Sequence, residues 1–263
     1  MKDDCPEELV DFAQHIADAV GEVQLRYFRK AVSVDYKSDS SPVTQADREA
    51  EQAARELIMK NYPEHGILGE EFPAHQQDAD YLWVIDPIDG TRLFMSGMPT
   101  FALLLGLAYK GEFILGVIDH AALGDRWVGA DGHGTRFNGE MVHARSCQQL
   151  RDAVLCRPGY EWHTEGHDAS IDAVNERVHW SRWGIAPYDY GLVASGHLDM
   201  VINMGPRVHD YAALEPVVRN AGGCVVDWYG ERVRVGSPEH IIVAGDKALI
   251  AQTLPLLATL EPR

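Results

Sequence analysis

A short acidic turn at residues 83–91, Trp-Val-Ile-Asp-Pro-Ile-Asp-Gly-Thr, has the residue types and spacing for metal chemistry. An apolar run ends at Asp86, and a second carboxylate, Asp89, follows three residues later. The proline between them fixes its backbone φ angle, and the glycine after them permits a tight turn. Such a turn can direct both carboxylates and the backbone carbonyl of Ile88 to one point. These hard oxygen donors suit Mg²⁺ rather than zinc.

The end of the same turn is suited to binding phosphate. Thr91 can begin a helix, and free backbone N–H groups at Gly90 and Thr91 would bind a phosphate oxygen. Asp, Pro and Gly are also common turn formers, so an ordinary turn is the alternative for this segment taken alone.

Three further acidic residues lie beside Gly or Thr at the expected ends of strands or starts of helices. Glu70 follows a short apolar strand within Gly-Glu-Glu, Asp47 lies near the opening of a helix after Thr44, and Asp210 lies at the start of another helix. A solvated surface would not place acids so regularly, so we interpret them as parts of one site.

Together these segments resemble the inositol monophosphatase family of Mg²⁺-dependent phosphatases. The resemblance spans most of the chain and implies an α+β fold, the layered αβαβα architecture of the sugar phosphatases, and a homodimer. The matching segments occur in the family's order: Ser41-Pro42-Val43-Thr44 with Asp47, Gly69-Glu70-Glu71, Asp86-Pro87-Ile88-Asp89-Gly90-Thr91, and Asp210 followed by Ala221-Gly222-Gly223.

The resemblance implies two or three Mg²⁺ ions as cofactors. Mg²⁺ would activate a water for in-line attack on phosphorus and stabilise the charge on the leaving oxygen. The four clustered carboxylates would repel a phosphate dianion; two Mg²⁺ ions would neutralise them, and a third would make the site attractive. Lys37 is expected near these ions. The implied metal ligands are Glu70, Asp86, the backbone carbonyl of Ile88, Asp89 and Asp210.

The same resemblance implies catalytic and substrate-binding roles. Glu70 and Thr91 would position and activate the attacking water, and Asp47 would support a third, weaker ion or its water shell. Gly90 and Thr91 would hold the phosphate through backbone N–H groups. The residues expected to contact the rest of the substrate are Asp189, Asn203 and Arg207.

Within the family, the chain resembles the histidinol-phosphate phosphatase branch more than the inositol phosphatases proper or the bisphosphate nucleotidases. The segments that carry this likeness are residues 91–99, 116–129, 190–199 and 210–218. They predict hydrolysis of a small phosphorylated metabolite, L-histidinol phosphate, to L-histidinol and phosphate in histidine biosynthesis.

Two departures from the branch pattern leave the substrate open. The branch usually has an acidic residue where this chain has Ala186, and often a glutamate where it has Asn203. Losing two carboxylates weakens recognition of a cationic ligand, although Asp189 could supply one from a shifted position. The alternatives are an inositol-1-phosphate phosphatase, a broad sugar or polyol phosphatase, and a non-catalytic protein that binds a phosphorylated metabolite.

The elements that must position these residues follow from hydrophobic periodicity. Helices are expected over residues 7–30 and 44–61, with a polar loop over 33–42 between them, and a strand hairpin over 100–118. The chain is expected to form two subdomains, an N-terminal α+β subdomain at 1–145 and a C-terminal α/β subdomain at 146–263 that completes the active site.

Composition excludes other classes of function. The 263 residues carry a formal net charge of −17 and no basic run, so neither nucleic acid nor an anionic membrane surface is an expected partner. Neither a membrane span nor a signal peptide is evident, and the four cysteines form no C-x-x-C pair, which predicts reduced thiols in the cytoplasm. His163 and His167 have the spacing of a helical zinc site, but the glycine between them favours an exposed loop.

Overall fold

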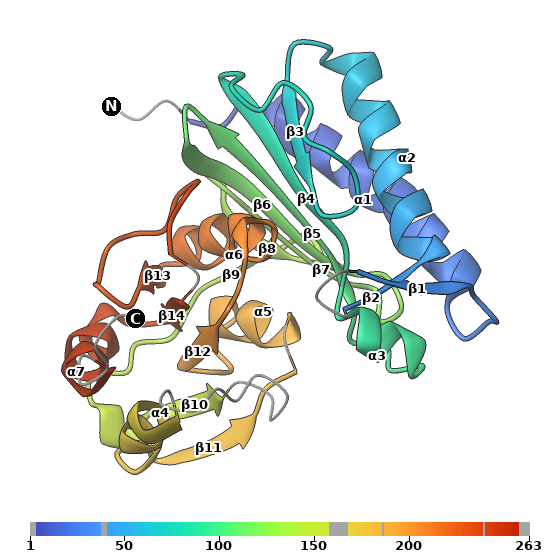
Figure 1. Ribbon diagram of the computed structural model, residues 1–263. Coiled ribbons are helices and arrows are strands. Elements are labelled where there is room, and N and C mark those ends of the chain that lie inside the picture. Colours follow the sequence, from blue (N-terminus) through green and yellow to red (C-terminus); the bar gives the residue numbers. More distant parts are fainter. Residues whose placement is uncertain (1–3, 38–40, 158–167, 186, 239, 258–263) are drawn as a thin grey trace.

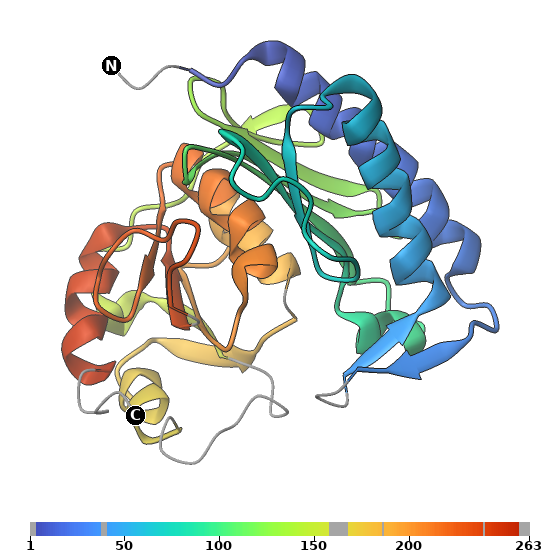
Figure 2. The same ribbon diagram turned by 45° about the horizontal axis from the view of Figure 1, so that its top comes forward.

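The computed structural model describes residues 4–37, 41–157, 168–185, 187–238 and 240–257 (Figure 1). It confirms the α+β fold with five layers, in the order helices, sheet, helices, sheet, helices. Figure 2, turned by 45°, shows the same two sheets on either side of the middle helices. Within the described residues, no helix is both long enough and apolar enough to cross a membrane.

The first sheet has seven strands in sequential order. Its strands β3 and β4 are parallel, and every other neighbouring pair is antiparallel. The hairpin expected over residues 100–118 forms its centre. The strands are β3 (Gly66–Gly69), β4 (Tyr81–Asp89), β5 (Ala102–Tyr109), β6 (Glu112–His120), β7 (Asp125–Ala130), β8 (Gly134–Phe137) and β9 (Glu140–Val142).

Two long helices, α1 (Glu7–Tyr27) and α2 (Gln45–Asn61), cover the outer face of this sheet. Each presents one apolar face, so that Ile16, Val20 and Ile58 are completely buried against the sheet. Helix α2 begins at a capping box, in which the Thr44 hydroxyl accepts the N–H groups of the first turn.

The expectation of a loop over residues 33–42 is wrong. Strands β1 (Val34–Tyr36) and β2 (Pro42–Thr44) pair antiparallel there, with Val34 opposite Thr44. Each strand has three residues, which is too short for an alternating hydrophobic pattern to show, so the backbone pairing defines them.

The second sheet has five strands and mixed direction. Strand β10 lies parallel to β11 and β12, whereas β14 is antiparallel to both of its neighbours. A separate apolar core fills the space between this sheet and two outer helices, α4 (Asp168–Asn175) and α7 (Lys247–Leu257). In spatial order the strands are β11 (Trp180–Trp183), β10 (Val154–Arg157), β12 (Met200–Met204), β14 (His240–Ala244) and β13 (Cys224–Asp227).

Two helices, α5 (Tyr188–Ala194) and α6 (Val208–Asn220), form the middle layer. Helix α6 packs on β5, β6 and β7 of the first sheet, although its sequence belongs to the second half of the chain. This packing does not test the expected boundary between two subdomains at residue 145, which stays a prediction. The remaining short helices are α3 (Thr91–Met95) and the 3₁₀ turn η1 (Leu150–Asp152).

A row of three glycines brings α6 unusually close to the first sheet. Gly106, Gly116 and Gly129 lie opposite one another on β5, β6 and β7. A Cβ atom on Gly116 would lie 2.1 Å from the carbonyl oxygen of Ala213, and one on Gly129 would lie 2.5 Å from the Cα of Val217. Because no side chain intervenes, the backbone of α6 lies directly on the strands.

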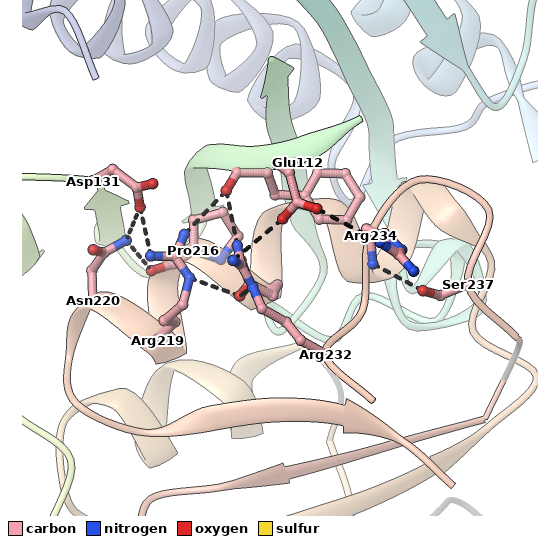
Figure 3. Close-up of polar contacts among 10 residues, drawn as sticks. Glu112, Asp131, Pro216, Arg219, Asn220, Arg232, Arg234 and Ser237 are labelled. Carbon is pink, nitrogen blue, oxygen red and sulfur yellow. Dashed lines mark hydrogen bonds and ion pairs between the residues drawn. The ribbon is translucent and has the colours of Figure 1, made fainter. Parts of the chain in front are cut away.

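Ion pairs fix the C-terminal half of α6 (Figure 3). The buried carboxylate of Glu215 accepts hydrogen bonds from the Nε atoms of Arg219, at 2.7 Å, and Arg232, at 2.6 Å. Both guanidinium groups also donate to the carbonyl oxygen of Phe113, and Arg219 pairs with Asp131. Helix α6 is thereby tied to the end of β6 and to the loop after β13.

Substituting Gly116→Ala should destabilise the protein, because its new methyl group would overlap the α6 backbone, which cannot move aside as a side chain can. We expect a loss of more than about 3 kcal/mol in the free energy of unfolding, measured by denaturant titration. Gly21→Ala, within helix α1, is the control, since its Cβ would meet side-chain atoms alone, the Ala121 methyl group at 3.2 Å and a carboxylate oxygen of Asp119 at 3.5 Å. Equal effects of the two substitutions would contradict the close approach.

Candidate active site

A β-bulge directs Asp86 and Asp89 to the same side of β4. Residues three apart in a regular strand face opposite sides, but the pairing shifts between Asp86, opposite Leu104, and Asp89, opposite Ala102. The Ile88 N–H donates to Oδ1 of Asp86 at 3.0 Å, which stabilises the turn. Both carboxylates predicted from the sequence therefore lie at one point.

Glu70 reaches this point from the end of β3, the strand parallel to β4. Its backbone N–H donates to the carbonyl oxygen of Ile85 at 3.2 Å. The next residue, Glu71, is held through its N–H by the buried carboxylate of Glu51, which also pairs with Arg55. This carboxylate lies where a Cβ of residue 69 would be, so Gly69 is required.

Asp210 comes from the other half of the chain, in the first turn of α6. Its Oδ2 accepts the backbone N–H of Arg207 at 2.5 Å, a helix-capping contact. Oxygen atoms of Asp86, Asp89 and Asp210 lie within 4.8 Å of one another, and so do ligand atoms of Glu70, Asp86 and His209. Asp86 belongs to both groups, which therefore adjoin.

Burial and mutual repulsion raise the pKa values of the clustered carboxylates. Burial, then Glu70, raises the pKa of Asp89 to about 7. The pKa of Asp210 also rises to about 7, mainly through burial. Burial followed by the charge of Glu70 raises the pKa of Asp86 well above its ordinary value. Cations at this point would remove the cost of keeping these groups charged, so the donor set fits a divalent metal.

Lys37 lies beside the cluster, as the sequence predicted. Its Nζ atom is 2.7 Å from Oε1 of Glu70 and 2.8 Å from Oε1 of Glu71. Burial lowers the pKa of this ammonium, but the two carboxylates outweigh burial and the pKa is raised. Lys37 thus neutralises part of the acidic charge on the side of the site formed by β1.

Asp47, Thr44 and Thr91 form a hydrogen-bonded chain at the edge of the cluster. Oδ2 of Asp47 accepts the Thr44 N–H at 2.8 Å and the Thr44 hydroxyl at 2.5 Å. The Thr91 hydroxyl lies 3.3 Å from Oδ1 of Asp47 and 3.2 Å from the carbonyl oxygen of Ile88. Asp47 is thus held where it can accept a hydrogen bond from the Thr91 hydroxyl.

A cavity of 440 Å³ adjoins the carboxylates and contains the three predicted substrate residues in its walls. Asp189 is buried, and its oxygens accept hydrogen bonds from Arg182, the Ile185 N–H and the Cys156 thiol. Its contact with substrate stays a prediction. Arg207 is exposed at the rim. Ala186, His163 and His167 lie outside the described residues.

Asn203 lies deeper in the wall and donates to the Tyr190 hydroxyl at 2.5 Å. Burial, then the charge of Asp89, raises the pKa of Tyr190 well above its ordinary value. Neither Tyr190 nor His209 is among the site residues expected from the sequence. A signal existed for His209, because it directly precedes Asp210 at the same helix start, whereas the position of Tyr190 depends on how α5 packs.

A larger hollow of 810 Å³ lies between α1 and strands β6–β8. Arg126 in its wall is paired with Asp119, at 2.7 Å, and with Asp18, at 2.9 Å. Neither of the metal-binding clusters found among the described residues lies there. The smaller cavity is therefore the candidate active site.

Five layers around converging carboxylates define a phosphatase of the sugar-phosphatase type. The family model described as "Inositol monophosphatase family" matches residues 6–260, so this chain belongs to that family and is a Mg²⁺-dependent phosphatase.

Individual relatives agree with this assignment. The chain is 41% identical over 251 residues to "Bifunctional phosphatase IMPL2, chloroplastic" of Arabidopsis thaliana, covering 92% of this chain and 72% of the relative. It is 33% identical over 226 residues to a histidinol-phosphatase of Chlorobaculum parvum, covering 85% and 87%. A solved inositol monophosphatase from Zymomonas mobilis superimposes with a TM-score of 0.87 at 38% identity, covering 96% of this chain and 98% of that one.

The raised pKa of Asp89 predicts how the metal-free protein responds to pH. Its pKa is about 7 in the folded state and near 3.8 when unfolded, so ionisation costs increasing stability as the pH rises from about 4 to 7. In EDTA, Asp89→Asn should therefore melt several degrees above wild type at pH 8, with a smaller difference at pH 5.

Thermal melts at the two pH values, with and without Mg²⁺, check this prediction. The exposed Asp78→Asn is the matched control and should leave the melting temperature unchanged. Mg²⁺ should stabilise wild type and the control but not Asp89→Asn. A lower melting temperature of Asp89→Asn than of wild type at pH 8 in EDTA would contradict the electrostatic argument.

Proposed function

We propose that this chain hydrolyses L-histidinol phosphate to L-histidinol and phosphate, as a step of histidine biosynthesis. The observation that carries the choice of substrate is the 33% identity to a histidinol-phosphatase over 85% of the chain. The 38% identity to an inositol monophosphatase over a similar share keeps inositol 1-phosphate as the second candidate.

The proposed metal ligands are Glu70, Asp86, the carbonyl of Ile88, Asp89 and Asp210. Their support is the convergence of oxygen donors from β3, β4 and α6, together with the raised pKa values of the aspartates. Two or three Mg²⁺ ions would supply charge neutralisation and activate the attacking water.

The protein's own groups would orient the attack. Asp47 accepts a hydrogen bond from the Thr91 hydroxyl, so that a lone pair of the hydroxyl oxygen is available to a water that donates to it. Glu70 offers a second acceptor on the same water. The backbone N–H groups of Gly90 and Thr91, at the start of α3, would bind phosphate oxygens.

The part of the cavity away from the metal ligands would determine which phosphate ester binds, because it contacts the alcohol portion of the substrate. Arg182 already pairs with Asp189, which reduces the negative charge that a cationic amine would meet there. The hydrogen-bonded Asn203 and Tyr190 offer neutral polar groups instead. This observation favours a neutral polyol phosphate as the alternative substrate.

Thr91→Ala should lower kcat by about 10²-fold, because one positioning hydrogen bond to the nucleophile is lost. Its melting temperature should stay within about 1 °C of wild type, since little apolar area is removed. Ser96→Ala, at the end of the same helix and hydrogen-bonded only to its own turn, is the control. Unchanged kcat for Thr91→Ala would remove this residue from the mechanism, and wild-type turnover in excess EDTA would contradict metal dependence.

Steady-state kinetics on a panel of substrates tests the proposed specificity. The kcat/KM for histidinol phosphate should exceed those for inositol 1-phosphate, fructose 1,6-bisphosphate and adenosine 3′,5′-bisphosphate at fixed Mg²⁺. Asn203→Glu should raise the ratio of histidinol phosphate to inositol 1-phosphate by about tenfold, since one charge-assisted hydrogen bond contributes about 1.5–3 kcal/mol.

Asn203→Gln, which adds no charge, is the control for that substitution. A wild-type preference for inositol 1-phosphate of tenfold or more would overturn the proposed substrate and leave the phosphatase assignment standing.

We also propose a homodimer in the cytoplasm. The edge strand β11 exposes Trp180 and Trp183, large apolar side chains of the kind that subunit interfaces cover. All four cysteines are free thiols, as expected for a reducing compartment.

A further inference from the structure

His209 lies at the metal cluster in a position that the sequence analysis did not assign. It is the second residue of α6, next to Asp210, and lines the candidate cavity. A nitrogen of its ring and carboxylate oxygens of Glu70 and Asp86 lie within 4.8 Å of one another. Metal–ligand bonds of about 2.0–2.2 Å could join these three atoms after small side-chain movements.

The two adjoining groups of ligands differ in chemistry. Asp86, Asp89 and Asp210 offer oxygen alone, which suits Mg²⁺. Glu70, Asp86 and His209 offer two oxygens and one imidazole nitrogen. Imidazole is a common ligand of first-row ions such as Co²⁺ and Zn²⁺, and Mn²⁺ accepts it more readily than Mg²⁺ does, so the mixed group favours these ions over Mg²⁺.

The backbone holds His209 in place, and its ring is available. The Arg207–Asp210 capping contact and the close packing of α6 on Gly106 and Gly116 fix the helix start. The charge of His209 acts on the neighbouring Asp210, whose pKa it lowers, and a ring nitrogen lies close to the carboxylates of Glu70 and Asp86. A half-buried imidazole this close to two carboxylates can therefore share a metal ion with them.

We propose that a ring nitrogen of His209 directly ligates the divalent ion held by Glu70 and Asp86, so that this position binds Mn²⁺ and other first-row divalent ions more tightly than an all-oxygen site would. The proposal rests on the metal ligands of the proposed function and adds a nitrogen donor to them. It makes the two adjoining ion positions chemically unequal.

Pulsed EPR of Mn²⁺ bound to the full chain tests this directly, because a coordinated imidazole gives a characteristic ¹⁴N modulation. Wild type should show the modulation, and His209→Gln should lose it. By isothermal titration, His209→Gln should weaken Mn²⁺ binding by about tenfold or more, while Mg²⁺ binding changes by less than about threefold.

Two further variants make the result decisive. The exposed His197→Gln should retain both the modulation and the Mn²⁺ affinity. His209→Asn provides a second replacement, and melts in EDTA verify that each variant is folded. Absence of ¹⁴N modulation in folded wild type, or equal losses of Mn²⁺ and Mg²⁺ affinity in His209→Gln, would overturn the proposal. Turnover of histidinol phosphate is measured separately, so failure of the substrate assignment would leave the EPR result interpretable.

Discussion

The site depends on the direct contact between the backbone of α6 and the first sheet. Asp210 and His209 come from the second half of the chain, whereas Glu70, Asp86 and Asp89 come from the first. Only a helix seated on the glycines of β5 and β6 can bring these groups together, because one methyl group would overlap the carbonyl of Ala213. The ion pairs of Glu215 then fix the opposite end of the same helix.

This contact concentrates negative charge that the protein alone balances only in part. Lys37 pairs with Glu70 and Glu71 on one side, but the aspartates face each other in a buried place, where burial and repulsion raise their pKa values. The repulsion between these carboxylates therefore lowers the stability of the metal-free fold and increases the affinity of the site for cations. Strained electrostatics of this kind are typical of functional sites.

Much of the fold and of the site could be predicted from the sequence, because each depends on local patterns. The amphipathic helices and the central hairpin have hydrophobic periods that can be recognised in the sequence alone. The turn around Asp86 can be recognised in the same way from the spacing of its residues. Strands β1 and β2 could not be predicted in this way, since three residues are too few for a period to show and the strands are defined by their backbone pairing. Nor could the sequence show that Arg182 pairs with Asp189, or that Asn203 contacts Tyr190, because these contacts arise where separate elements pack.

The sharing of Asp86 between two groups of ligands has a thermodynamic consequence. Near neutral pH the aspartates of the cluster bind protons part of the time, so an ion that enters either group must displace them. Metal uptake and proton release are then a single linked equilibrium. A change in cellular Mg²⁺ or in acidity would move the same population of molecules between an empty, protonated form and a loaded form.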